Sequence, residues 1–166
     1  MTDTVEVLAR GALIGLGGAA AMDLWGWVAR RALGITGLDY ALLGRWIGHA
    51  SRGRLHHTSI SAARPIRGER TLGWAAHYAI GITFALLLLV VEGIGWAHAP
   101  TLWPALLVGW VTIVAPWFVM QPGMGLGVAA SRTPRPGAAR LRNLASHTAY
   151  GIGLFVSATV VGAVWS

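Results

Sequence analysis

The chain has 166 residues, of which 55% are hydrophobic and only 11% are charged, and its mean hydropathy is +0.58. Soluble domains carry about 25% charged residues, so this composition indicates a protein solvated largely by lipid. The formal net charge of +7 does not indicate nucleic-acid binding, because the charges separate apolar segments and do not cover one face of a soluble domain. The absence of cysteine excludes thiol catalysis, disulfides and thiolate metal sites.

Four apolar segments have the length of about 20 residues that a helix needs to cross a bilayer. Because backbone in lipid must satisfy its own hydrogen bonds, each segment is expected to be helical. The acidic start Met-Thr-Asp-Thr-Val-Glu is unlike a signal peptide, so the first segment is expected to remain in the mature chain. We therefore predict an all-α fold, a single transmembrane domain over residues 1–166, with spans at residues 5–29, 72–91, 102–120 and 144–165.

The segment from Asp39 to Ala50, between the first two spans, is expected to form a short amphipathic helix with Asp39 as its N-cap. Arg45 and His49 are expected to face water or headgroups, so that the helix lies in the cytoplasmic interface. Its apolar side is formed by Tyr40, Leu43, Trp46 and Ile47.

The basic residues are all arginines, and their distribution predicts the orientation of the chain. Eight lie in the predicted loop 30–71 and four in the predicted loop 121–143, whereas the loop 92–101 has none. By the positive-inside rule, the two arginine-rich loops face the cytoplasm of a bacterial inner membrane, and both termini lie on the periplasmic or outer side.

Both arginine-rich loops are expected to attract anionic groups. Residues 51–70 are basic, and the prolines of the segment 131–136 favour an extended backbone whose arginines could hold a phosphate. The arginines predicted to contact anionic headgroups or phosphate are Arg45, Arg52, Arg54, Arg132 and Arg135.

The second and fourth spans begin with similar sequences. Residues 75–82 read Ala-Ala-His-Tyr-Ala-Ile-Gly-Ile and residues 145–152 read Ala-Ser-His-Thr-Ala-Tyr-Gly-Ile, which are identical at five of eight positions. Short matches also arise by chance in a chain rich in Ala, Gly and Ile. The shared histidine and glycine nevertheless favour two pseudo-repeated helical hairpins around an axis along the membrane normal.

Polar residues inside spans are candidates for function by default. Asp23 shares a helix face with Gly11, Gly15 and Ala19, and small residues mark the places where membrane helices approach each other. The sequence therefore predicts a polar cluster that points into the bundle from the cytoplasmic half of the spans. Its members are Asp23, His77, Gln121 and His147.

Several chemistries are open to this cluster. A carboxylate beside imidazoles can exchange protons. Asp23, His77 and His147 could bind a divalent metal, and the two histidines could ligate haem. A hydrogen-bonded network that only joins the helices is the alternative, because no metal-binding spacing is present and no catalytic residue is identified. A second possible cluster in the first loop consists of His49, His56 and His57, although solvated loop histidines are more common.

Three functions remain open for the chain. It could be a small transporter or a proton- or ion-coupled component, a non-catalytic subunit of a larger membrane complex, or a haem- or metal-dependent oxidoreductase. Four short spans leave little room for a substrate path. We therefore expect a homo-oligomer or a partner protein in the bilayer if transport is the function.

Five segments carry a resemblance to a known family. They are Ala-Met-Asp-Leu-Trp (21–25), Asp-Tyr-Ala-Leu-Leu-Gly-Arg-Trp-Ile-Gly-His (39–49), His-Tyr-Ala-Ile-Gly (77–81), Met-Gln-Pro-Gly-Met-Gly (120–125) and Ala-Ala-Ser-Arg-Thr-Pro (129–134). Together they resemble an uncharacterised family of bacterial membrane proteins, domain of unknown function 2938. The resemblance implies a small multi-pass inner-membrane protein and implies no reaction, substrate or cofactor.

Overall fold

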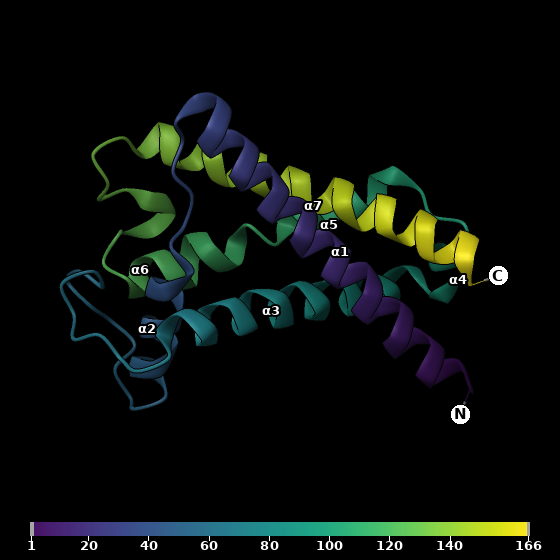
Figure 1. Ribbon diagram of the computed structural model, residues 1–166, viewed down its shortest axis with the longest axis horizontal. Helices are drawn as coiled ribbons and strands as arrows, with labels where there is room; N and C mark the ends of the chain where they lie inside the picture. Colours follow the sequence, from purple (N-terminus) through teal and green to yellow (C-terminus); the bar gives the residue numbers. More distant parts are fainter. Residues whose placement is uncertain (1, 166) are drawn as a thin grey trace. The chain divides into compact units, whose positions relative to one another are not determined.

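The computed structural model describes residues 2–165, whose regular elements are all helices with no strand among them (Figure 1). Four helical segments are long and apolar enough to cross a membrane, which confirms the all-α expectation and the number of apolar helices. They comprise Thr4–Leu33, Glu69–Glu92, Leu102–Gly123 and Pro136–Val164. The elements in chain order are α1 (Thr2–Leu33), α2 (Tyr40–Ala50), α3 (Glu69–Glu92), α4 (Ile94–His98), α5 (Leu102–Val111), the π-helix η1 (Pro116–Met120), α6 (Gln121–Gly123), the 3-10 helix η2 (Val128–Ala130) and α7 (Pro136–Val164).

The third apolar segment is not a uniform α-helix. Helix α5 ends at Val111, where the Thr112 hydroxyl donates to the Gly109 carbonyl at 2.7 Å, and a π-helix begins at Pro116. Proline has no N–H to donate, and its ring crowds the carbonyl of the residue four positions earlier. Pro116 therefore removes one hydrogen bond from the helix, and the helix continues from this residue with the wider π-turn.

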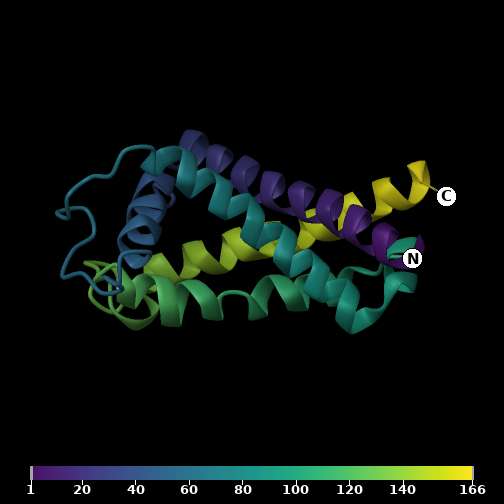
Figure 2. The same ribbon diagram turned by 90° about the horizontal axis from the view of Figure 1, so that it is seen from below.

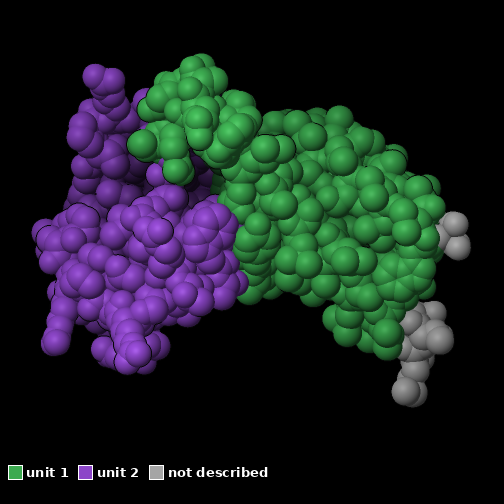
Figure 3. Space-filling model, in the orientation of Figure 1, with its two compact units in different colours: residues 1–36, 78–112, 145–166 green, residues 37–77, 113–144 purple. Residues whose placement is uncertain are grey.

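The chain divides into two compact units, which are coloured separately in Figure 3. Unit 1 comprises residues 1–36, 78–112 and 145–166, and unit 2 comprises residues 37–77 and 113–144. The expectation of a single domain over residues 1–166 stays a prediction.

Close approaches between helices hold unit 1 together (Figures 1 and 2). Helix α1 packs against α3 where a Cβ atom on Gly15 would lie 2.9 Å from the Gly81 carbonyl oxygen. It packs against α7 where a Cβ atom on Gly153 would lie 3.0 Å from the Cα atom of Gly18. The Gly15 contact confirms the prediction that the small residues on the Asp23 face of α1 lie at a helix interface. The apolar core of the unit includes Ile14, Leu88, Trp96, Tyr150 and Leu154.

The apolar helices keep much of their apolar surface on the outside. Only 22–33% of the most apolar window of each of the four segments is buried. Val91 is 79% exposed, Leu24 is 62% exposed and Val160 is 55% exposed. Exposed apolar surface of this extent is typical of a surface that contacts lipid or another protein.

Unit 2 is built around α2, which confirms the helix predicted in the first loop. The Asp39 side chain accepts a hydrogen bond from the Ala41 N–H at 2.9 Å, as expected of an N-cap. The backbones of α2 and α3 touch at Gly44 and Gly73, where a Cβ atom on either glycine would clash with the facing helix. Leu43, Ile60 and Met124 form the small apolar core of this unit.

The orientation predicted for α2 is wrong in one respect. Arg45 and His49 were expected to face water or headgroups, but both are buried. Gly44 and Gly48 have no side chains, so this face of α2 lies close to its neighbours in unit 2. A buried arginine must be paired, and Glu69 supplies the partner.

Candidate functional site

Asp23 lies on α1 in unit 1, on the face that packs against α3. Its carboxylate accepts a hydrogen bond from the Tyr78 hydroxyl at 2.9 Å. Farther along the same interface Gly15 lies against Ile82, so the two helices approach closely enough for this contact. The structure thus brings an ionisable residue of one apolar helix together with a proton-donating hydroxyl of the next.

His77 belongs to unit 2 and lies in an aromatic cluster near the start of α3. Its Nε2 atom is 3.2 Å from the Tyr40 hydroxyl, and the two rings stack with their centroids 4.4 Å apart. Trp74 completes the cluster, with its ring centroid 4.4 Å from that of Tyr40 and 6.1 Å from that of His77. The first residue of α2 therefore helps to orient the imidazole.

His147 belongs to unit 1 and lies against α5. Its Nδ1 atom is 3.1 Å from the Thr112 hydroxyl and 3.0 Å from the Gly109 carbonyl oxygen. Because the Thr112 hydroxyl itself donates to Gly109, both neighbours of Nδ1 act as acceptors. The neutral ring is then protonated on Nδ1, and its lone pair lies on Nε2.

Gln121 is a buried residue of unit 2 at the start of α6, 5% exposed. The Asn143 side chain satisfies its neighbours when its amide oxygen points toward Gln121. In this orientation the oxygen accepts hydrogen bonds from Gln121 Nε2 at 2.7 Å and from Trp117 Nε1 at 3.0 Å. Among the described residues, the Gln121 Oε1 atom has no hydrogen-bond partner. A buried acceptor without a partner destabilises the fold, so it is a candidate for a role other than packing.

The four residues of the predicted polar cluster thus lie in two different units. Asp23 and His147 belong to unit 1, and His77 and Gln121 belong to unit 2. Within unit 1, Asp23 bonds to Tyr78 whereas His147 bonds to α5. In the part of the chain that the structure describes, no group of three or more His, Asp or Glu side chains could hold a metal ion. The cluster as a whole stays a prediction.

The proposed internal repeat gains no support from these surroundings. His77 stacks on Tyr40 from α2, whereas His147 contacts Thr112 and Gly109 at the end of α5. The segment between the third and fourth spans contains the short helices α6 and η2 and no helix as long as α2. The two matching histidines therefore have different partners.

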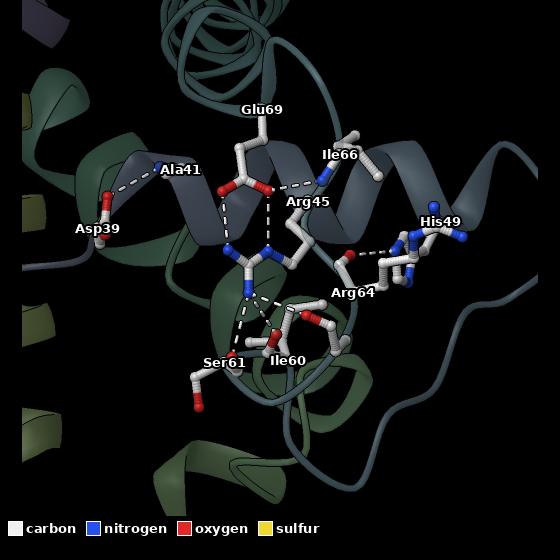
Figure 4. Close-up of polar contacts among 10 residues, drawn as sticks. Asp39, Ala41, Arg45, His49, Ile60, Ser61, Arg64, Ile66 and Glu69 are labelled. Carbon is white, nitrogen blue, oxygen red and sulfur yellow. Dashed lines mark hydrogen bonds and ion pairs between the residues drawn. The ribbon is translucent and has the colours of Figure 1, made fainter.

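Arg45 is the centre of the hydrogen-bond network of unit 2 (Figure 4). Its Nη2 and Nε atoms donate to the two carboxylate oxygens of Glu69 at 2.8 and 2.9 Å. Its Nη1 atom donates to the carbonyl oxygens of Ser61 and Ala63 at 3.1 Å and of Ile60 at 3.3 Å. The donors of Arg45 are thus used within the fold, and the predicted contact of Arg45 with headgroups stays a prediction. The hydrogen bond to Glu69 raises the pKa of the Arg45 guanidinium.

Two of the three loop histidines form a buried pair. His49 Nδ1 lies 2.8 Å from His57 Nε2, whereas His56 is exposed. The outer nitrogens face carbonyl oxygens, because His49 Nε2 is 3.0 Å from that of Arg64 and His57 Nδ1 is 3.3 Å from that of Gly123. Each contact with a carbonyl oxygen needs a proton on the ring nitrogen, and the contact between the two rings needs one more. The three hydrogen bonds therefore need three protons, whereas two neutral imidazoles carry only two.

Burial acts against that third proton. Desolvation lowers the pKa of the His57 imidazole, and the positive charges of Arg54, His49 and His56 lower it further. The hydrogen bond to the Gly123 carbonyl raises the same pKa, but this effect is smaller than that of desolvation. The pair thus links α2, the loop after it and α6, and burial lowers the pKa of its His57 ring.

The sequence did not indicate the partners of these residues. Tyr78, Thr112 and Glu69 contact the predicted residues, but each is a common residue type with no distinctive spacing. One signal was present, since Glu69 and Asp39 are the only acidic residues of the first loop and its borders, among many arginines. An isolated acid in such a segment indicates a paired arginine.

Arg10 is a further buried charge, which was not singled out from the sequence. It is 2% exposed and donates to Glu6 at 2.7 Å and to the Trp165 carbonyl oxygen, and its guanidinium lies over the Trp165 ring. His98 contacts the same Glu6 carboxylate at 3.2 Å. These residues join α1, α4 and the end of α7 in unit 1.

The fold and these residues define an all-helical protein with four apolar helical segments, three of which carry ionisable side chains. A family described as "Protein of unknown function (DUF2938)" matches residues 12–161, so the chain belongs to this family, as its sequence resemblance indicated. The match includes every residue of the predicted polar cluster. No curated protein and no solved structure matches the chain.

Proposed function

We propose that the protein is integral to the inner membrane and crosses it four times, with residues 30–71 and 121–143 in the cytoplasm. The four apolar segments and their exposed apolar faces support the membrane location. The twelve arginines of the two loops support the orientation. Both termini then lie on the outer side.

The activity that we propose is proton translocation, or proton-coupled ion movement, with Asp23 as the proton-binding group. The observation that carries this proposal is the hydrogen bond from the Tyr78 hydroxyl to the Asp23 carboxylate. A carboxylate inside an apolar helix is unfavourable unless it is partnered, and such residues mark proton and ion pathways. The other polar residues predicted from the sequence, His77, Gln121 and His147, stay candidates for further groups of a proton pathway.

A proton-flux measurement tests this activity. The purified protein is reconstituted into liposomes that contain a pH-sensitive dye, and valinomycin with a potassium gradient imposes a membrane potential. We expect proton entry above that of protein-free liposomes, and we expect Asp23→Asn to reduce it to that background. The matched control is Glu92→Gln, which neutralises an exposed carboxylate and should leave the flux unchanged. Equal flux for the wild type and Asp23→Asn would contradict the proposal, as would a wild type that equals protein-free liposomes.

A non-catalytic membrane subunit is the second candidate. It is favoured by the same Asp23–Tyr78 hydrogen bond, because a partnered carboxylate can serve only to join two helices. In that case Asp23→Asn lowers the thermal stability and the wild type shows no proton flux. The alternative of a haem or metal protein rests on the histidines of the sequence, and a visible absorption spectrum with a metal assay of the purified protein tests it.

A further inference from the structure

Unit 2 has a strong excess of positive charge. Residues 37–77 and 113–144 contain ten arginines and only two acidic residues, Asp39 and Glu69. Both carboxylates already have partners within the unit, since Asp39 caps α2 and Glu69 pairs with Arg45. The remaining arginines therefore give this unit a positive field that favours anionic ligands.

A pocket opens at the surface of this unit beside its second arginine-rich segment. Its volume is about 330 Å³, which lies at the lower end of the range for small-molecule sites, about 300–1,000 Å³. Arg132, Ser131 and His56 supply hydrogen-bond donors, and the other lining residues are apolar or glycine. The complete lining consists of His56, Pro122, Gly127, Val128, Ser131 and Arg132.

The backbone of the loop 127–132 is held in an uncommon conformation that places these donors. Ala129 and Ala130 have φ angles of 48° and 59°, in the left-handed region that residues other than glycine rarely adopt. Hydrogen bonds fix this turn, because the Arg132 N–H donates to the Leu126 carbonyl at 2.9 Å and Arg140 Nε donates to the Ala129 carbonyl at 2.9 Å. The loop is therefore a fixed support for Ser131 and Arg132.

Gly127 permits the close packing of this loop. Its φ angle is +74°, and a Cβ atom there would clash with the Ser131 hydroxyl and lie 2.9 Å from Arg132 Cγ. Only glycine fits this position without moving the two side chains that line the pocket.

We propose that this pocket binds a phosphate group through Arg132, Ser131 and His56. The Arg132 guanidinium can donate two parallel N–H bonds, and the Ser131 hydroxyl and the His56 imidazole N–H donate from other sides. Donors from several directions suit the tetrahedral oxygens of phosphate better than a planar carboxylate. The phosphate can belong to an anionic lipid headgroup or to a free anion, and the experiment distinguishes these sources. The site does not depend on the activity proposed for Asp23.

The test compares two arginine variants of the full chain. Arg132→Gln removes the guanidinium from the pocket, whereas Arg135→Gln removes an exposed arginine nearby that does not line it. In the first arm, the detergent-solubilised protein is titrated with inorganic phosphate by calorimetry at constant ionic strength. In the second arm, its melting temperature is compared in phosphatidylcholine nanodiscs with and without phosphatidylglycerol. Ser131→Ala is the additional variant in case Arg132→Gln does not fold.

We expect Arg132→Gln to weaken phosphate binding, or the stabilisation by phosphatidylglycerol, by about tenfold, as the loss of a charge-assisted hydrogen-bond pair would. Arg135→Gln should change either quantity by about twofold or less, because Arg135 does not line the pocket and acts on it only through the screened field of the unit. Dependence on Arg132 in the first arm identifies a free phosphate, and dependence in the second arm alone identifies a lipid headgroup. Equal effects of the two variants, or no dependence on Arg132 in either arm, would overturn the proposal.

Discussion

Arg45 and Glu69 form a two-point ion pair, in which Nη2 and Nε of the arginine bind the two carboxylate oxygens at 2.8 and 2.9 Å. Glu69 Oε2 also accepts from the Ile66 N–H at 3.0 Å, and the third guanidinium nitrogen donates to the carbonyl oxygens of residues 60, 61 and 63. One buried pair thus connects α2, the loop after it and the first residue of α3 (Figure 4). The first arginine-rich loop is therefore a folded part of unit 2.

Arg45→Lys is expected to lower the free energy of unfolding by about 2–4 kcal/mol, because lysine cannot reproduce a two-point pair and three carbonyl contacts. Thermal unfolding in detergent, followed by circular dichroism, measures the effect. Trypsin should also cleave residues 51–68 faster in this variant. Arg52→Lys changes an exposed arginine and should have no effect. Equal melting temperatures for Arg45→Lys and the wild type would show that the pair does not support the fold.

Gly44→Ala is expected to destabilise the protein by about 1–3 kcal/mol, because the added methyl group would clash with the Glu69 carbonyl at the contact of α2 with α3. The matched control is Gly26→Ala in α1, where no described atom lies within 4 Å of an added Cβ. That change should be neutral or stabilising by up to about 1 kcal/mol, because alanine favours the helix. If both variants unfold at the same temperature, the α2–α3 contact is not as close as described.

Local sequence patterns predicted the apolar helices and α2, because hydropathy and N-capping act over a few neighbouring residues. They did not predict that α7 begins at Pro136, since Arg140 and Asn143 lower the hydropathy of a segment that is nevertheless helical. The burial of Arg45 depends on Glu69, which is 24 residues away in the chain. Contacts of this kind are set by the tertiary fold and leave no periodic signal. For the same reason the sequence did not reveal the hydrogen-bond partners of the predicted polar residues. Tyr78, Thr112 and Tyr40 each lie outside the helix of the residue that they contact.

Acid is expected to destabilise unit 2 through His57. Burial lowers the pKa of this imidazole in the folded state, whereas the unfolded chain binds the proton near pH 6.5. Between the lowered pKa and about pH 6.5 the unfolded state holds more protons, so stability falls as the pH drops through this window and is fully present above it. The melting temperature measured against pH should therefore decline below about pH 6.5.

His57→Gln should flatten that decline, because glutamine does not titrate but can still hydrogen-bond to His49. His56→Gln is the matched control, since it removes the exposed neighbouring histidine and should leave the decline in place. A decline of the same size in His57→Gln would assign the acid sensitivity to another group.

Tyr78→Phe is expected to destabilise the protein by about 0.5–1.5 kcal/mol, because it removes the hydroxyl that donates to Asp23. A double-mutant cycle with Asp23→Asn isolates the contact, since the two changes should not add if both act through one hydrogen bond. Thermal unfolding of the two single variants and the double variant measures the coupling. Full additivity would mean that Tyr78 and Asp23 do not interact.

Membrane topology is the central claim, and cysteine labelling tests it most directly because the natural chain contains no cysteine. Ser59→Cys places a thiol in the first arginine-rich loop, and Thr101→Cys places one in the loop before α5, both at exposed positions. A membrane-impermeant maleimide is applied to intact spheroplasts and to lysed ones. We predict that Thr101→Cys is labelled in both and that Ser59→Cys is labelled only after lysis. Labelling of Ser59→Cys in intact spheroplasts, or of both positions from the same side, would contradict the account.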